Sequence, residues 1–526
     1  MTSGIVAAGS GETAAAGGAM LEAGGNAVDA AVAAAFASFV AEPSIVSLGG
    51  GGYALVQGAD DGKTRVYDFF CAFPGQNGAR PEHLDFFAVY ADFGSARQEF
   101  HIGRGSVAVP GNAAGLCRLH ADAGRLPLTT VLEPAILLAQ NGLALGPFNA
   151  QVGRILAPIV GHTPEVAALF GAPDHFVDAA HVHRNPDLAA TLTALGREGP
   201  GLFYRGDIAQ AILADQRRHG GLLTPDDLVS YQVLVRKPLH RRYRGYDLFT
   251  NPPPSRGGAL IAFSLALLDA HDLGSLPFGS ARHQRLLAEV MRQTNLARTH
   301  LDDHGDTDLF LAASHIAAHG HDLASRLAGT TGLSPVDAPA PPAPNHTSHI
   351  SVLDGEGTVV SLTTTAGEGA GFVVPGTGVI LNNILGEADL HPHGFHRGTP
   401  GARIGSMMAP TLVLEGGRPL LALGSGGSNR LRTAILQVLL NELDFRLGLV
   451  AAVEAPRLHF EGGVMQLEAG ALRPHTVGWL RRWGYDVVAW PDRHMYFGGV
   501  HSVGRSDRGF DGAGDPRRSG AVVRVP

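Results

Sequence analysis

The sequence predicts a layered fold that mixes helices and strands, an α/β (α+β layered) architecture. Helical patterns dominate from about residue 113 to 300, and strand patterns take over after a proline-rich stretch at 334–346. Hydrophobic residues make up 45% of the 526 residues, which is enough for a large buried core. The proline-rich stretch is the only predicted linker, so we expect the rest of the chain to pack into this layered body.

The predicted elements alternate along the chain. Residues 12–40 have a helical pattern with glycine interruptions, and they lead through a glycine turn into a strand that ends near residue 57. Further helices are predicted at 207–219, 259–269, 286–301 and 429–445. Beyond the linker, strands are predicted in a hairpin at 347–365, at 378–383 and within 409–427.

The hairpin has a register that can be counted from the sequence. Two β-prone runs flank a three-residue loop, Gly355-Glu356-Gly357, in which glycine supplies the positive φ that such loops need. Asp354 then pairs with Thr358, and the count carries back to place Thr347 opposite Thr365. The same register puts four aliphatic side chains on one face: Ile350, Val352, Val360 and Leu362.

The other face of this hairpin is polar. It carries Thr347, His349, Ser351, Ser361, Thr363 and Thr365. Such a face is a poor choice for an apolar core, so two interpretations remain open. It is either the floor of a functional site or a solvated face of an antiparallel sheet.

Charge and cysteine content exclude several classes of protein. A net charge of −8 and a pI near 6.3 give no basic field, so we expect no nucleic-acid partner and no membrane partner. Two cysteines, Cys71 and Cys117, cannot build a disulfide framework. The N-terminal stretch lacks a basic region followed by a continuous apolar run, so we expect a cytoplasmic location.

Three short motifs suggest ligand binding. The runs LGGGGY at 48–53 and LGSGGSNR at 423–430 resemble phosphate loops, but neither has a complete nucleotide-binding fingerprint. The second run offers backbone N–H groups and a helix N-terminus, which can stabilise an oxyanion. His391, His393 and His396 form a conceivable metal trio, but their glycine- and proline-rich surroundings indicate a loop without an acidic ligand. We therefore predict no metal and no cofactor.

Ordered motifs across nearly the whole chain resemble those of one known family. They are, in the family's order, LEAGGNAVDAAVAAAFASFVAEPSIVSLGGGGYALV, GRGSVAVPGNAAGL, FYRGDIAQAI, GGLLTPDDLVSYQVLVRKPL, YRGYDLFTNPPPSRGG, TSHISVLDGEGTVVSLTTT, GVILNN, SMMAPTLV and GDPRRSGA. So many segments in one order make chance similarity negligible. On these motifs the chain is identified as a member of the γ-glutamyltransferase (gamma-glutamyltranspeptidase) family.

The resemblance implies a fold and a processing event. Members fold as N-terminal-nucleophile (Ntn) hydrolases, so we expect a four-layer αββα sandwich with an added helical region. Their chain cuts itself before the threonine of a T-[ST]-H motif, which is Thr347-Ser348-His349 here. Cleavage between His346 and Thr347 would give a large subunit of residues 1–346, ending in the tether 334–346, and a small subunit of residues 347–526.

The resemblance also assigns catalytic roles. Thr347 is the expected nucleophile, and its freed α-amine, with a reference pKa of about 7.7 to 8.0, is the expected base. Thr365 matches the family's second threonine and would orient the nucleophile. Gly426 and Gly427 match the oxyanion hole, and a one-residue ambiguity in this match leaves Ser428 as an alternative donor.

The substrate-binding positions depart from the family pattern. The arginine that holds the substrate α-carboxylate in the family motif DFRE is Phe70 here, and an apolar ring cannot bind a carboxylate. Three further polar positions are occupied by Gly367, Ile384 and Met407. Those that remain polar are Asn383, Glu387 and Ser406. The stretch 387–406 is shorter than in members with a lid loop, which implies a more open pocket.

Three functions remain open at this stage. The first is hydrolysis or transfer of a γ-glutamyl-type acyl group, with Glu387 binding the ammonium of the small-molecule substrate. The second is an amidase or acylase activity on a donor that has no α-carboxylate. The third is an uncleaved, non-catalytic binding protein, which the retention of Thr347, Thr365 and the glycine pair disfavours.

Overall fold

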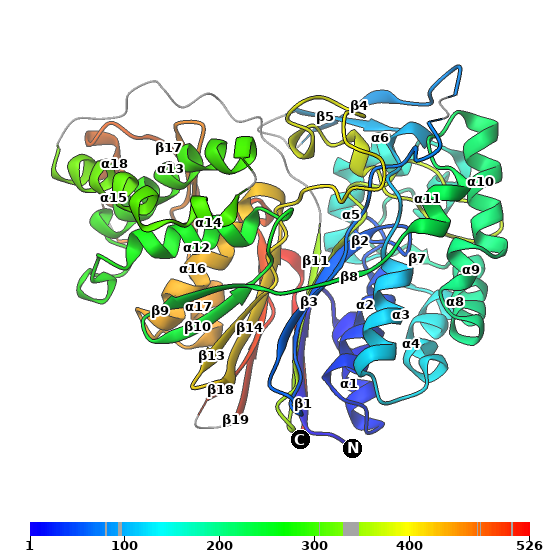
Figure 1. Ribbon diagram of the computed structural model, residues 1–526, viewed down its shortest axis with the longest axis horizontal. Coiled ribbons are helices and arrows are strands. Elements are labelled where there is room, and N and C mark those ends of the chain that lie inside the picture. The colour runs from blue at the N-terminus through cyan, green and yellow to red at the C-terminus, as the bar shows by residue number, and fades with distance from the viewer. Residues whose placement is uncertain are drawn as a thin grey trace.

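The structure is a computed structural model that describes residues 1–78, 81–92, 97–304, 306–329, 347–470, 472–473, 475–506 and 509–526. The predicted tether at 334–346, with the cleavage-site residue His346 at its end, lies outside the described residues. Two β-sheets lie side by side at the centre of the molecule, and helices lie on both outer sides (Figure 1). The N- and C-terminal strands are neighbours in one of these sheets.

The first sheet has seven strands in the order β20-β1-β11-β12-β2-β3-β8, and all neighbours are antiparallel. Its strands are β1 (Gly4–Ala8), β2 (Gly51–Gln57), β3 (Thr64–Phe69), β8 (Leu234–Arg236), β11 (Ser348–Asp354), β12 (Val359–Thr365) and β20 (Ala521–Val525). The predicted hairpin β11–β12 lies near the middle, between β1 and β2. Strands from before and after residue 347 are therefore interleaved in one sheet and must fold together.

The second sheet has six antiparallel strands in the order β19-β18-β14-β13-β10-β9. Its strands are β9 (Leu239–Tyr243), β10 (Tyr246–Thr250), β13 (Thr411–Glu415), β14 (Arg418–Gly426), β18 (Gly499–Ser506) and β19 (Gly509–Ala513). It packs face to face against the first sheet, because β11 and β12 contact β14 and β11 also contacts β18. The hairpin therefore has a helix on one side and a sheet on the other.

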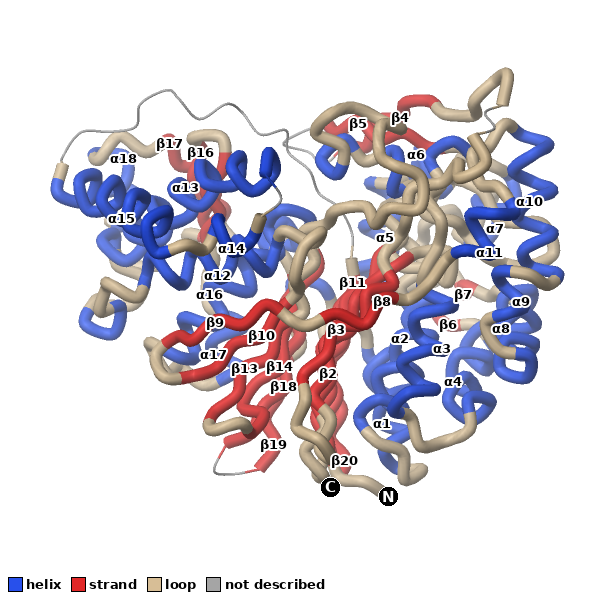
Figure 2. The backbone as a smooth tube through the Cα atoms, in the orientation of Figure 1, coloured by secondary structure: helices blue, strands red, loops and turns tan. Residues whose placement is uncertain are grey.

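Helices cover the two outer faces and complete the predicted four-layer αββα sandwich, as Figure 2 shows. The first sheet is covered by α1 (Gly11–Glu22), α2 (Ala27–Ala41) and α3 (Asn112–Ala123), with α4 (Leu128–Asn141) packed on α2. The second sheet is covered by α12 (Gly257–Leu268), α16 (Leu431–Leu443) and α17 (Leu449–Glu454). The fold class expected from the resemblance is confirmed.

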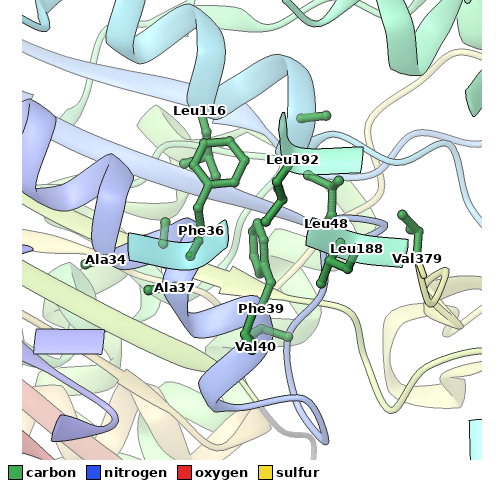
Figure 3. Close-up of a cluster of buried hydrophobic side chains, with 14 of the residues drawn as sticks. Ala34, Phe36, Ala37, Phe39, Val40, Leu48, Leu116, Leu188, Leu192 and Val379 are labelled. Atoms are coloured by element: carbon green, nitrogen blue, oxygen red, sulfur yellow. The ribbon is translucent and has the colours of Figure 1, made fainter. Parts of the chain in front are cut away.

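Helix α2 shows why the sequence favours this arrangement. It is apolar on all sides, as expected of a helix enclosed by other elements, and every residue of it is buried. Asn26 begins the helix through a capping box, in which its side chain accepts from the Asp29 N–H and Asp29 reciprocates. Figure 3 shows Phe36 and Phe39 of α2 among aliphatic side chains from neighbouring elements.

Two outer groups extend the sandwich. The predicted added helical region comprises α5 (Gly146–Ile155), α6 (Ala157–Val160), α7 (Pro164–Leu169), α8 (Pro186–Glu198), α9 (Gly201–Tyr204), α10 (Asp207–His219) and α11 (Pro225–Ser230). The other group has α13 (Ala281–His304), α14 (Thr307–Phe310), α15 (Ala313–Ala328) and α18 (Thr476–Arg482) beside a three-stranded sheet of β15 (Leu458–Glu461), β16 (Val464–Glu468) and β17 (Asp486–Trp490). Two small ribbons pair β4 (Phe87–Asp92) with β5 (Arg97–Ile102) and β6 (Leu143–Ala144) with β7 (Val182–His183).

The counted hairpin register is confirmed as far as the strands extend. Ile350 pairs with Leu362 and Ser348 pairs with Thr364, and the loop closes through a hydrogen bond from the Asp354 N–H to the Thr358 carbonyl at 3.0 Å. One predicted strand is wrong, because residues 378–383 form only isolated bridges and turns. The sequence pattern also missed β1, which is too short for its periodicity to be recognised.

Candidate active site

The polar face of the hairpin is buried between the two sheets, so the interpretation as a solvated face is wrong. Its side chains instead bond the facing sheet. The Ser361 hydroxyl donates to the Leu423 carbonyl at 2.9 Å and accepts from the Thr411 N–H at 3.1 Å, while the Ser351 hydroxyl donates to the His501 carbonyl at 3.1 Å. Buried hydroxyls need such partners, and here they join the sheets.

His349 belongs to this polar layer. Its Nδ1 lies 2.8 Å from the Thr363 hydroxyl and its Nε2 lies 2.9 Å from the Ser351 hydroxyl. Burial lowers the pKa of His349 well below its ordinary value, so the ring is neutral near pH 7. Both ring nitrogens have hydroxyl partners within the layer, which makes His349 a structural member of it.

Thr347 lies immediately before β11 and is 5% exposed. Its carbonyl packs against Gly426, the last residue of β14. A Cβ at position 426 would lie 2.0 Å from the Thr347 carbonyl oxygen, so only glycine fits there. The strand end therefore brings the predicted nucleophile and the predicted oxyanion-hole turn together. Gly427 and Ser428 follow in the same turn, which opens α16.

Thr365 is the last residue of β12 and is 6% exposed. Its hydroxyl accepts a hydrogen bond from the Gly367 N–H at 3.0 Å. One step beyond the Ser348–Thr364 pair, the antiparallel register leads to Thr347 and Thr365. The two threonines therefore lie at the same end of the hairpin.

Asn383, Glu387 and Gly367 lie together next to Thr365. Gly367 has a φ of +65°, and a Cβ there would lie 2.2 Å from both the Asn383 Oδ1 and the Glu387 Oε1 atoms. The Asn383 side chain accepts from the Glu368 N–H at 2.8 Å. Two of the predicted polar substrate residues thus converge on one point, and glycine at 367 leaves room for them.

The segment after Asn383 also reaches the glycine turn. The short helix η4 (Ala388–Leu390) carries Asp389, whose carboxylate accepts from the Ser428 hydroxyl at 3.2 Å. This contact connects the Asn383–Glu387 side of the site to the Gly426–Gly427 side. Thr347, Thr365, the 383–389 segment and the turn therefore surround one location.

The departures Phe70, Ile384 and Met407 are all buried in one hydrophobic cluster. The Phe70 ring stacks on Tyr53, with ring centroids 5.6 Å apart and an interplanar angle of 23°. Ser406, beside Met407, exchanges a hydrogen bond with the Ser255 hydroxyl at 3.1 Å. The three apolar replacements are thus compatible with one another, while Ser406 is held by a neighbouring hydroxyl.

Sequence reasoning missed an arginine near Phe70. Arg403 donates to the Asp68 carboxylate at 3.1 Å, and Asp68 also accepts from Arg236 at 2.7 Å. The Arg403 guanidinium also lies over the Tyr231 ring, 4.4 Å from its centroid. Arg403 is therefore already bonded to a buried carboxylate. In the sequence, Asp68 was indicated only by the first two letters of the family motif DFRE, which correspond to Asp68 and Phe69.

The remaining motifs are the LGGGGY run and the histidine trio. The LGGGGY run opens β2, where Gly51 pairs with Thr365. His391 is buried and lies within hydrogen-bond distance of the Ile384 carbonyl, and His396 lies within hydrogen-bond distance of the Gly105 carbonyl. His393 is exposed. Among the described residues, no group of His, Cys, Asp or Glu side chains is arranged to hold a metal ion. Within the same residues, no helix has the length and apolar character needed to span a bilayer.

Known proteins resemble the chain over almost its whole length. The gamma-glutamyltranspeptidase family profile matches residues 13–525. The acylase ACY 1 proenzyme of Pseudomonas sp. (strain V22) is 34% identical, covering 95% of this chain and 89% of the relative. The glutathione hydrolase proenzyme of Pseudomonas aeruginosa is 31% identical, covering 95% of this chain and 90% of the relative.

A solved structure agrees with these relatives. The crystal structure of cephalosporin acylase from Bacillus halodurans matches with a TM-score of 0.82 and 26% identity, covering 99% of this chain and 96% of the other. The family match, the sequence relatives and the fold all point the same way. The chain belongs to the gamma-glutamyltranspeptidase family of Ntn-hydrolase enzymes.

Proposed function

We propose that this enzyme cleaves its own chain before Thr347 and then hydrolyses amides through an acyl-enzyme on that residue. The observation that carries the proposal is the packing of the Thr347 carbonyl against Gly426, at the hairpin end that also holds Thr365. Nucleophile, orienting hydroxyl and oxyanion donors then come from three adjacent chain segments. No histidine–carboxylate pair is needed, in keeping with the structural role of His349.

Self-cleavage would begin with attack of the Thr347 hydroxyl oxygen on the carbonyl carbon of residue 346. The C–N bond breaks as the C–O bond forms, and the acyl group moves from nitrogen to oxygen. Water then hydrolyses the ester and leaves Thr347 with a free α-amine. We propose fragments 1–346 and 347–526. They would remain associated, because both central sheets contain strands from each fragment.

Turnover would reuse the same hydroxyl. The free α-amine accepts the hydroxyl proton while oxygen attacks the amide carbonyl of the donor, and it returns the proton to the leaving amine. Backbone N–H groups of the Gly426–Gly427 turn would stabilise the negative charge on the tetrahedral intermediate. Thr365, whose hydroxyl accepts from Gly367 N–H, would orient the nucleophile. Water then releases the acid.

The donor is proposed to be an acyl group without an α-carboxylate, which makes the enzyme an acylase. Phe70 stands where the family arginine would bind that carboxylate, and Ile384 and Met407 extend the apolar surroundings. Losing a bidentate arginine contact costs about 2 to 4 kcal/mol, or about 30- to 1000-fold in affinity, unless another group replaces it. Arg403 is already engaged by Asp68. The 34% identity to an acylase proenzyme supports this donor class.

A γ-glutamyl donor is the second candidate. Asn383 and Glu387 retain oxygens that converge beside Gly367, and a carboxylate there suits the ammonium of a γ-glutamyl group. The similarity to a glutathione hydrolase proenzyme supports this reading. The two candidates share one mechanism and differ only in what the pocket does with the α-amino acid end of the donor.

Thr347→Ala should remain a single chain, because no hydroxyl is left to attack the preceding carbonyl. Intact mass spectrometry of the unmodified protein should find a 180-residue fragment beginning at Thr347. Ser348→Ala, one residue along, is the matched control and should still be processed. Efficient cleavage of Thr347→Ala at the same bond would show that an external protease does the work, and an uncut, inactive wild type would support a non-catalytic protein.

Thr365→Val should fold normally but mature and turn over about 10- to 1000-fold more slowly, because it keeps the β-branched shape and deletes the orienting hydroxyl. Band ratios on a denaturing gel report maturation, and released amine reports turnover. Thr363→Val, on the same strand face but bonded to His349, should instead lower the melting temperature. Unchanged rates in Thr365→Val would contradict the assigned role.

Donor preference should separate the two candidates. Three anilides are compared by kcat/KM: γ-glutamyl, glutaryl, which lacks the amine, and butyryl, which lacks both amine and carboxylate. If the enzyme is an acylase, butyryl and glutaryl anilides should be hydrolysed at least as well as the γ-glutamyl compound. A preference for the γ-glutamyl compound over butyryl by about 100-fold or more would overturn the acylase assignment, since that corresponds to nearly 3 kcal/mol of recognition of the amino-acid end.

Phe70→Arg alone should improve γ-glutamyl hydrolysis only modestly, because the guanidinium would lie in an apolar cluster without polar partners. Adding Met407→Ser should help more than the sum of the single changes. Phe70→Leu controls for the lost stacking on Tyr53. Asparagine at 367 should not help, since its Cβ would collide with Asn383 and Glu387.

A further inference from the structure

Arg518 is a buried arginine at the end of the short helix η7 (Pro516–Arg518), just before β20. Only 4% of it is exposed. Its neighbour Arg517 is fully engaged, with hydrogen bonds to the carboxylates of Glu468 at 2.8 Å and Asp515 at 3.2 Å. The two adjacent arginines of the GDPRRSGA motif therefore have different surroundings, although the sequence gives no sign of it.

The guanidinium of Arg518 has few hydrogen-bond acceptors around it. Its Nη2 donates to the Met495 carbonyl at 3.4 Å, while Nε and Nη1 have no hydrogen-bond partner among the described residues. No carboxylate of the described residues lies within ion-pair distance of it. Buried donors normally have partners, so two guanidinium nitrogens without an acceptor on a buried cation call for a functional reason.

The two Nη atoms of Arg518 lie next to the glycine turn. Nη1 lies 3.1 Å from the position a Cβ would take on Gly426, and Nη2 lies 3.3 Å from the corresponding position on Gly427. The Gly426 position is the same one that lies 2.0 Å from the Thr347 carbonyl oxygen. The guanidinium thus lies next to the two residues proposed to bind the oxyanion.

Arg518 stays charged at neutral pH even though burial lowers its pKa to about 10, with the nearby cation Arg430 acting in the same direction. Glu368 and Asp515 attract it only from a distance, and Arg457 repels it. A buried cation without a paired anion costs free energy, and an anion that forms nearby recovers part of that cost. The charge that appears during the reaction is such an anion.

We propose that Arg518 is a positioning residue whose positive charge, held beside the Gly426–Gly427 turn, stabilises the tetrahedral intermediate formed at Thr347. This inference rests on the proposed function. As the Thr347 oxygen bonds to the donor carbon, the carbonyl π electrons move to its oxygen, which becomes the oxyanion. Collapse restores the C=O bond and expels the amine with the proton from the α-amine. Arg518 exchanges no proton or bond in this step.

The test compares Arg518→Met and Arg518→Gln, which are neutral, with Arg518→Lys, which keeps the charge. Removing one direct oxyanion donor typically slows catalysis about 100- to 1000-fold. A charge that does not contact the oxyanion should have a smaller effect on the rate. We expect kcat for butyryl anilide, or for whichever anilide the wild type prefers, to fall about 10- to 100-fold in the neutral variants, with KM changed less than about 3-fold. Arg518→Lys should recover most of kcat. Arg524→Met, an exposed arginine on β20, is the matched control.

A second readout isolates the charge of the intermediate. A boronic acid analogue of the donor forms a negatively charged tetrahedral adduct with the Thr347 hydroxyl, so its inhibition constant should rise in the neutral variants by about the same factor as kcat falls. A role confined to packing would lower the melting temperature without this parallel change.

Several results would overturn the proposal. The first two are an unchanged kcat in both neutral variants and an equal loss of kcat in Arg518→Lys and Arg518→Met. The other two are an effect on KM that is limited to carboxylate-bearing donors and failure of both neutral variants to fold. The donor-specific KM effect would instead make Arg518 a substrate-binding residue. A wild type that neither cuts itself nor releases amine would refute the proposed function, so the two failures are distinguishable.

Discussion

Hydrogen bonding across the two central sheets is the constraint on which the site depends. The hairpin β11–β12 turns serine, threonine and histidine side chains toward a second sheet, where water does not reach them. Each hydroxyl must find a partner, and Ser361 and Ser351 find theirs on Leu423 and His501. A slip of one residue would turn Ile350 and Leu362 into this layer and strand the hydroxyls among the helices. The register is therefore fixed, and with it the position of Thr347.

Much of this could be predicted from the sequence. The hairpin register follows from loop length and alternation, and the glycine-interrupted helical pattern at 12–40 corresponds to helices α1 and α2. The sequence could not predict what covers the polar face of the hairpin. Alternation shows which residues share a face, but it does not show what packs against that face. The sheet that covers it comes from β14 and β18, more than 50 residues away along the chain from Thr365. Long-range packing of this kind has no local signal.

The site residues divide in the same way. Thr347, Thr365 and the glycine pair could be named from motifs, and the structure brings their segments together at one hairpin end. The carboxylate of Asp68, which holds Arg403 and Arg236, and the open side of Arg518 could not be named, since each depends on partners distant in sequence. The predicted strand at 378–383 failed for a related reason. Its Asn382 side chain bonds the backbone at Gly49 and Ala108, and these bonds replace a strand ladder.

The proposed roles of the arginines would explain how one scaffold can lose a substrate clamp and keep its chemistry. A carboxylate clamp acts on the far end of the donor and binds ground state and transition state alike, so its replacement by Phe70 changes which donors bind. In the proposed role, a cation beside the Gly426–Gly427 turn acts only when charge develops on the reacting carbonyl, so it would affect the rate for every donor. Arg403 is hydrogen-bonded to the Asp68 carboxylate, which it shares with Arg236, whereas Arg518 has no carboxylate partner within the described residues. If Arg518 acts as proposed, the cationic charge of this pocket serves the reaction centre, and substitutions around Phe70 can change specificity without weakening the stabilisation of the intermediate.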